Sequence, residues 1–150
     1  MASEAANPER IPPLADGALE RLVRFLPTFE DPEFIPGIAR GGKDDSSGVI
    51  QWPWFDYAPA VTDFEQTLYR DGWIVAFDWG VWEDKGRALV TINGIESADL
   101  DDLRRLLTVI FRKERFCDGT VEVAFRDGTL LRIVQRTAAW NSTKSREESK

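Results

Sequence analysis

The sequence predicts a mainly α-helical fold, a single compact domain with at most a small β element. Three segments carry this signal, residues 14–26, 59–70 and 98–115, because each repeats apolar residues at the spacing of one helix face. The 150 residues suit one domain, and 43% of them are hydrophobic, which is enough to form a core. We expect about four to six helices within residues 14–140. The tails are expected to be disordered, because residues 1–13 hold three alanines, three prolines and few apolar anchors, and residues 141–150 are polar throughout.

Proline sets the limits of the predicted elements in the first half. The helix over 14–26 is expected to end at Pro27, whose ring cannot continue a helix. Residues 27–59 hold five of the chain's eight prolines and a glycine- and serine-rich run at 41–48, so a long loop is expected there. The next helix is predicted to begin with Pro59 at its first position.

The second half is predicted to begin with a short β-like run and to contain the most regular helix. Residues 73–77 are apolar, aromatic and β-branched, and Asp78 is expected to cap a weak helix over 79–89. The helix over 98–115 has Ser97 as its expected N-cap, with acids in its first turn and bases in its last, which suits the helix dipole. Its core stripe is expected to consist of Leu100, Leu103, Leu106, Leu107, Ile110 and Phe111.

Residues 120–136 fit two structures. One is a hairpin that turns at Asp127-Gly128, which would make the fold α+β with a C-terminal hairpin at 120–136. The other is two short helices, because apolar residues also recur there at helical spacing. Periodicity alone cannot separate the two for such short apolar runs.

Composition excludes several classes of site. The chain has no histidine, which removes histidine-based triads and histidine metal sites, and its one cysteine excludes an internal disulfide and a cysteine zinc cluster. We therefore expect no metal and no cofactor. Cys117 is interpreted as a buried packing residue, since no histidine could activate it. No apolar run approaches the ~20 residues of a membrane helix, and no signal peptide is present, so a cytoplasmic protein is expected.

Charge divides the chain into an acidic front and a basic back. The net charge is −7, with 16 acids against 5 bases in residues 28–102 and 8 bases against 4 acids in residues 103–136. Nucleic-acid binding is disfavoured, because a net negative surface repels phosphates. Arg112 and Arg115 are expected to pair with carboxylates of the acidic front. The competing interpretation is that they bind an external phosphate.

Aromatic residues concentrate between residues 52 and 82, and we interpret them either as core or as the edge of a binding groove. The acids among them could act as an acid–base pair, although surface and capping roles are favoured. The candidate site residues are Trp52, Trp54, Asp56, Tyr57, Asp78, Trp79 and Trp82.

These features favour a non-enzymatic protein-binding or regulatory module that uses residues 40–57 and the aromatic edge to hold a protein partner. An acidic inhibitor of a nucleic-acid enzyme is one form of this hypothesis, and it depends on charge alone. The alternative is a carboxylate-dependent hydrolase, with Asp56 and Asp78 meeting in an aromatic cleft. Homo-oligomerisation is left open.

Two blocks of sequence resemble a family of small bacterial proteins known only as a domain of unknown function. One is the Arg-x-x-Arg-Phe-x-x-Gly pattern from Arg112 to Gly119, and the other is Phe77-Asp78-Trp79. The resemblance covers about residues 15–136 and implies a bacterial, cytoplasmic protein, with two short helices over 120–136. It implies no activity, cofactor or catalytic residue.

Overall fold

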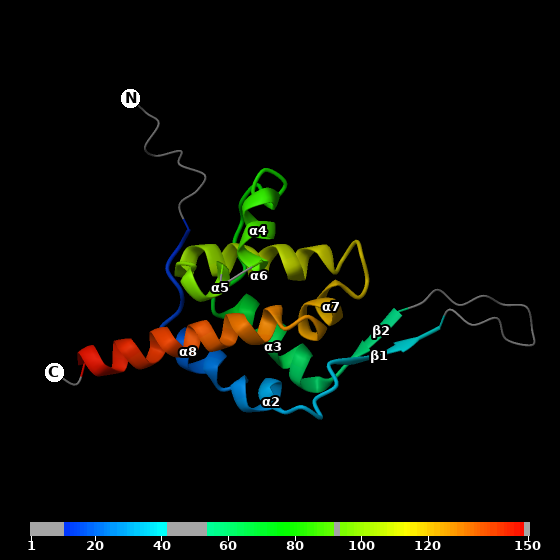
Figure 1. Ribbon diagram of the computed structural model, residues 1–150, viewed down its shortest axis with the longest axis horizontal. Coiled ribbons are helices and arrows are strands. Elements are labelled where there is room, and N and C mark those ends of the chain that lie inside the picture. Colours follow the sequence, from blue (N-terminus) through cyan, green and yellow to red (C-terminus); the bar gives the residue numbers. More distant parts are fainter. Residues whose placement is uncertain (1–10, 42–53, 92–93, 149–150) are drawn as a thin grey trace, which may run out of the picture.

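The computed structural model describes residues 11–41, 54–91 and 94–148, and it confirms a mainly helical fold with one small β element. In Figure 1, α6 and α8 cross the body, α4 projects on one side, and a two-stranded hairpin extends at one end. Helices α1, α2, α5 and α7 all pack against α8. The elements are α1 Ala18–Val23, α2 Leu26–Glu30, β1 Gly37–Arg40, β2 Trp54–Tyr57, α3 Pro59–Arg70, α4 Glu83–Val90, α5 Gly94–Ser97, α6 Leu100–Lys113, α7 Thr120–Arg126 and α8 Thr129–Glu148.

The first predicted helix is divided into two. Helix α1 ends at Val23, and α2 begins at Leu26 with Pro27 in its first turn. Pro27 was expected to terminate a helix, but it helps to begin one, because the first turn needs no intrahelical N–H donor and tolerates proline.

The predicted loop over 27–59 contains most of α2 and the hairpin, so that prediction is wrong over residues 27–30 and over the strands. Strands β1 and β2 pair antiparallel, with Gly37 opposite Tyr57 and Arg40 opposite Trp54. The pairing continues before β1, where the Ala58 N–H donates to the Pro36 carbonyl at 2.8 Å.

Helix α3 confirms the prediction that Pro59 begins a helix ending at residue 70, whereas the predicted strand at 73–77 is wrong. Trp73 and Val75 are buried in that segment. The Val75 N–H donates to the Thr108 hydroxyl of α6 at 3.0 Å. An apolar run can therefore be buried as irregular backbone when a neighbouring side chain satisfies its N–H groups.

Helix α6 matches the most regular predicted helix, but its cap differs. The Asp99 carboxylate accepts the Asp102 N–H at 2.7 Å and is the N-cap, in place of the expected Ser97. Ser97 ends α5, and its hydroxyl donates to the Gly94 carbonyl. Of the expected stripe, Leu100 is half-buried and the other five residues are buried.

Two helices, α7 and α8, occupy residues 120–136, so the hairpin alternative and the α+β fold class that goes with it are wrong. Gly128 joins them with φ +87°, a conformation that favours glycine. The Asp127 carboxylate accepts the Thr129 N–H at 2.9 Å and so caps α8. Helix α8 extends to Glu148, into the segment 141–150.

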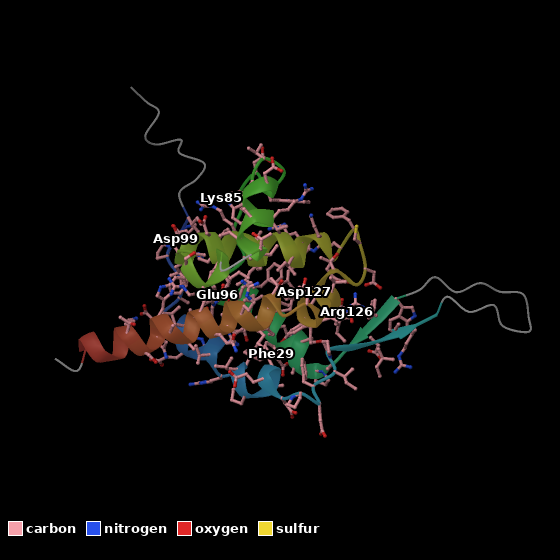
Figure 2. The ribbon with its side chains drawn as sticks, viewed as in Figure 1. Phe29, Lys85, Glu96, Asp99, Arg126 and Asp127 are labelled. Carbon is pink, nitrogen blue, oxygen red and sulfur yellow. The ribbon has the colours of Figure 1, made fainter. Side chains whose placement is uncertain are left out.

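The core is aromatic at its centre. Phe64 of α3 is fully buried, and its ring lies 5.1 Å from that of Phe29 and 5.2 Å from that of Phe25, both edge-on. Phe29, which points from α2 into the body in Figure 2, also meets Phe125 of α7 at 4.8 Å. One ring cluster therefore joins α2, α3 and α7.

Two arginine–carboxylate pairs join distant segments. Asp71, which is buried, receives Arg21 in a bidentate pair at 2.8 and 3.1 Å, and this pair links α1 to the end of α3. Glu96 of α5 (labelled in Figure 2) receives the Arg132 guanidinium of α8 at 2.7 and 2.8 Å. The hydrogen bonds from Arg132 lower the pKa of Glu96 to about 2.

This pair predicts a specific pH dependence. A lowered folded-state pKa means that the pair stabilises the fold above the ordinary value of 4.5 and that this contribution is lost as the pH falls towards about 2. We expect Glu96→Gln to melt below the wild type at pH 6, and the difference to shrink as the pH falls through that window. Thermal melts of both proteins across this pH range test it, and a constant difference would contradict it.

Candidate functional site

The β1–β2 hairpin has an inner and an outer face, because directly opposed residues of an antiparallel pair lie on the same side and successive residues alternate. The register places Gly37, Ala39, Phe55 and Tyr57 on one face, and Ile38, Arg40, Trp54 and Asp56 on the other. Phe55 and Tyr57 are half-buried while Trp54 and Asp56 are exposed, so the first set faces the body.

Phe55 holds the inner face against the α6–α7 connection. A Cβ at Gly119 would lie 2.8 Å from the Phe55 ring, so the ring packs directly on that glycine, whose φ is +97°. The Phe55 N–H donates to the Asp118 carboxylate at 2.8 Å. Glycine is required at 119 both by its backbone conformation and by this close approach.

Glu114 forms the polar centre of the anchor. Its Oε1 accepts the Tyr57 hydroxyl and the Val121 N–H, both at 2.7 Å, and its Oε2 accepts the Gly119 N–H at 2.8 Å. The Tyr57 hydroxyl in turn accepts the Glu122 N–H at 3.2 Å. These N–H groups begin α7, where no intrahelical acceptor exists, so Glu114 and Tyr57 together cap that helix.

Burial dominates the electrostatics of this cluster. Desolvation raises the pKa of Glu114 above its usual value, opposed by the N–H groups of Val121 and Gly119. Desolvation, followed by the hydrogen bond to Glu114, also raises the pKa of Tyr57, which stays a protonated donor at neutral pH. With its two oxygens accepting three donors, Glu114 is placed to fix the hairpin to the body.

The outer face combines large apolar side chains with an ion pair. Trp54 is 47% exposed and Ile38 is 54% exposed. Between them, Arg40 Nε lies 2.9 Å from Asp56 Oδ2. Exposed large apolar side chains gathered on one face typically mark an interaction surface.

The outer edge of strand β1 has no backbone hydrogen-bond partner among the described residues. Hydrogen-bonded and non-hydrogen-bonded pairs alternate in an antiparallel ladder, and the Ala58–Pro36 bond sets the phase. Ile38 and Arg40 therefore direct their N–H and C=O groups to β2, whereas Gly37 and Ala39 direct theirs outwards. The equivalent edge of β2 is covered, because the Phe55 N–H is bonded to Asp118. No described element lies beyond β1 in Figure 1.

The sequence-predicted site residues fall into separate groups. Trp54, Asp56 and Tyr57 lie on β2, with Tyr57 on the opposite face from the other two. Asp78, Trp79 and Trp82 lie just before α4, and Figure 1 shows α4 and the hairpin on different sides of the body. Trp52 lies outside the described residues. Of the remaining aromatic cluster, Phe64 and Trp73 are core.

Of two expectations for residues 112–117, one is not met among the described residues and the other is wrong. Arg112 and Arg115 form no ion pair with any carboxylate in the described ranges, and Arg115 instead reaches the Tyr69 hydroxyl at 3.5 Å. Cys117 is exposed, because it lies in the turn that follows α6. Sequence reasoning missed Glu114, whose signal was an acid shortly before the glycine that begins α7.

Neither a metal site nor a membrane-spanning helix is found among the described residues. No group of acidic or cysteine side chains in the described part of the chain is arranged to hold a metal ion. Among the described helices, none has both the length and the apolar character needed to cross a membrane.

Comparison with known proteins identifies only a family. The model of a family of unknown function, DUF6508, matches residues 14–143. No curated protein and no solved structure matches the chain.

Proposed function

This chain belongs to that family of unknown function, and from its geometry we propose that it is a non-enzymatic binding module that holds an extended segment of a partner protein on the β1 edge of its hairpin. The observation that carries the proposal is the open edge of β1 beside an exposed face bearing Ile38 and Trp54. Strand addition uses these two features together, with main-chain hydrogen bonds for affinity and side-chain contacts for specificity.

The anchor supports the proposal because it fixes the hairpin before any partner arrives. An isolated two-stranded hairpin is marginally stable, but Tyr57 and Phe55 tie this one to Glu114, Asp118 and Gly119. A preorganised edge avoids most of the entropic cost of ordering a strand on binding. The outer face is therefore suited to recognition rather than required for the fold.

The chemistry of the face indicates the partner segment. An added strand would place alternate side chains beside Ile38 and near Trp54, so apolar residues at every second position fit. Trp54 is the expected hot spot, since buried tryptophans dominate many interfaces. Asp56 is held by Arg40 at the surface, an arrangement that favours the binding module over the hydrolase alternative. The proposal includes a regulatory role for this binding, and the family resemblance adds to it the expectation of a bacterial, cytoplasmic protein.

A peptide-display selection tests this function. Short random peptides are selected on the full-length protein, and the enriched ones are synthesised and titrated by fluorescence anisotropy. We expect Trp54→Ala to weaken binding about tenfold or more. Ala39→Pro should also weaken it, because it removes an outward N–H, whereas Ala39→Ser keeps that N–H and should bind normally.

The control is Val81→Ala, which removes an even more exposed apolar side chain near α4 and should leave binding unchanged. Circular dichroism confirms that each variant is folded. Enriched peptides that bind Trp54→Ala and Ala39→Pro as tightly as the wild type would refute the proposed site, as would the absence of any enrichment.

A further inference from the structure

At the end of α6, the acidic side chains face the hairpin, and the two arginines bond to neither of them. Residues 112–118 contain three bases and two acids. Both acids are turned to the hairpin anchor, where Glu114 accepts from Tyr57 and the start of α7, and Asp118 accepts from Phe55. Neither Glu114 nor Asp118 forms an ion pair with Arg112 or Arg115, on a chain whose net charge is −7.

An aromatic side chain accompanies the arginines. Helical hydrogen bonding continues past α6, since the Arg115 N–H bonds the Arg112 carbonyl at 3.2 Å and the Phe116 N–H bonds the Lys113 carbonyl at 2.9 Å. These i→i−3 bonds form a tight turn of the 3₁₀ type, in which residues three apart lie one above the other, so Arg115 lies beside Arg112 and Phe116 is the next residue of the turn. Arg115 also reaches the exposed Tyr69 of α3. We call Tyr69, Arg112, Arg115 and Phe116 the basic patch.

The fold itself does not account for the basic patch. Cations at a helix C-terminus complement the helix dipole, but that effect does not explain why Phe116 is 78% exposed. Arg21, Arg40 and Arg132 each engage a carboxylate within the molecule. Arg112 and Arg115 form no such pair with the described residues, so their planar donors are available to an external carboxylate.

We infer that the basic patch is a second binding surface, separate from the hairpin edge, and that its partner is an acidic peptide segment with an apolar side chain among its carboxylates. Arg112 and Arg115 complement the acidic side chains, and Phe116 with Tyr69 covers the apolar one. A peptide fits better than a nucleic acid, because the basic patch contains two arginines and the net charge of −7 repels a long polyanion.

The test uses fluorescein-labelled peptides and the full-length protein, with binding followed by anisotropy. The first peptide is rich in Asp and Glu and has a central Phe, the second replaces Phe by Ala, and the third replaces the acids by Lys. We expect the first to bind most tightly, the second more weakly and the third not at all. Arg115→Ala and Phe116→Ser should each weaken the first about tenfold, and added salt should weaken it too.

Control variants separate this surface from the proposed function. Arg24→Ala removes an exposed arginine at the end of α1, and Trp54→Ala removes the hairpin side chain, and neither should change binding of the acidic peptide. If the acidic peptide does not bind the basic patch, the result of the peptide-display selection at the hairpin still stands. If the selection finds no hairpin peptide, the acidic-peptide result still stands. Equal binding of the acidic and Lys peptides, unchanged affinity of Arg115→Ala, or tighter binding of a short single-stranded RNA would overturn the inference.

Discussion

Replacing Phe64 by alanine is expected to lower the free energy of unfolding by about 3–5 kcal/mol, the usual cost of truncating a buried phenylalanine. Phe64 is 0% exposed, and its ring meets those of Phe25, Phe29, Phe111 and Phe125. The rings around it come from separate elements and cannot all close on the vacated space, so a cavity should remain. Urea denaturation followed by circular dichroism measures the loss.

Two variants of α3 serve as controls. Gln66→Ala changes an exposed residue of the same helix and should alter stability by less than about 0.5 kcal/mol. Phe64→Leu keeps most of the apolar volume and should fall between the wild type and the alanine variant. If Phe64→Ala lost less than about 1 kcal/mol, the aromatic cluster would not be the centre of the core.

Helices α3 and α6 could be predicted from the sequence because their signals are local and agree with one another. Pro59 at the first position of α3, the apolar stripe of α6 and the glycine after residue 71 all act within a few residues. The irregular backbone of residues 73–77 could not be predicted in the same way. The Val75 N–H of that segment bonds to the Thr108 hydroxyl of a different helix, which no local pattern indicates. Ser97 and Asp99 are both good caps, and only the position at which α6 begins separates them.

The hairpin and its anchor show why the site was only partly predictable. Trp54, Asp56 and Tyr57 were candidates because they are aromatic or acidic in a proline-rich segment. Trp54 and Asp56 lie on one face of the hairpin and Tyr57 on the other, as the strand register requires. That register could not be read from a segment whose composition predicts a loop. Glu114 lies 57 residues from Tyr57, and no local pattern indicates that the two meet. Because Glu114 bonds to Tyr57, it does not pair with Arg112 or Arg115, and these arginines can meet a partner.

Glu114→Ala is the second large effect that we expect, a loss of about 2–4 kcal/mol. The change leaves the Tyr57 hydroxyl and the N–H groups of Gly119 and Val121 without their acceptor, and partly buried donors are costly to leave unpaired. Tyr57→Phe removes only the hydroxyl and should cost about 1 kcal/mol. Because both changes break one shared bond, the double variant should lose less than the sum of the two.

The effect of Glu114→Gln on stability should depend on pH, because glutamine cannot ionise as the Glu114 carboxyl group does. The raised pKa means that the folded state holds this proton more tightly than the unfolded chain does, so the contribution is complete below the ordinary value of 4.5 and declines as the pH rises through the folded-state pKa. The stability gap between the wild type and Glu114→Gln should therefore be widest near pH 4 and narrow towards neutrality, the reverse of the trend expected at Glu96. Urea denaturation at several pH values measures the gap.

Glu114→Ala should also weaken the binding of the peptides selected on the hairpin, even though Trp54 and Ile38 are unchanged, because an unanchored edge must be ordered on binding. Normal peptide affinity together with normal stability would show that Glu114 does not fix the hairpin.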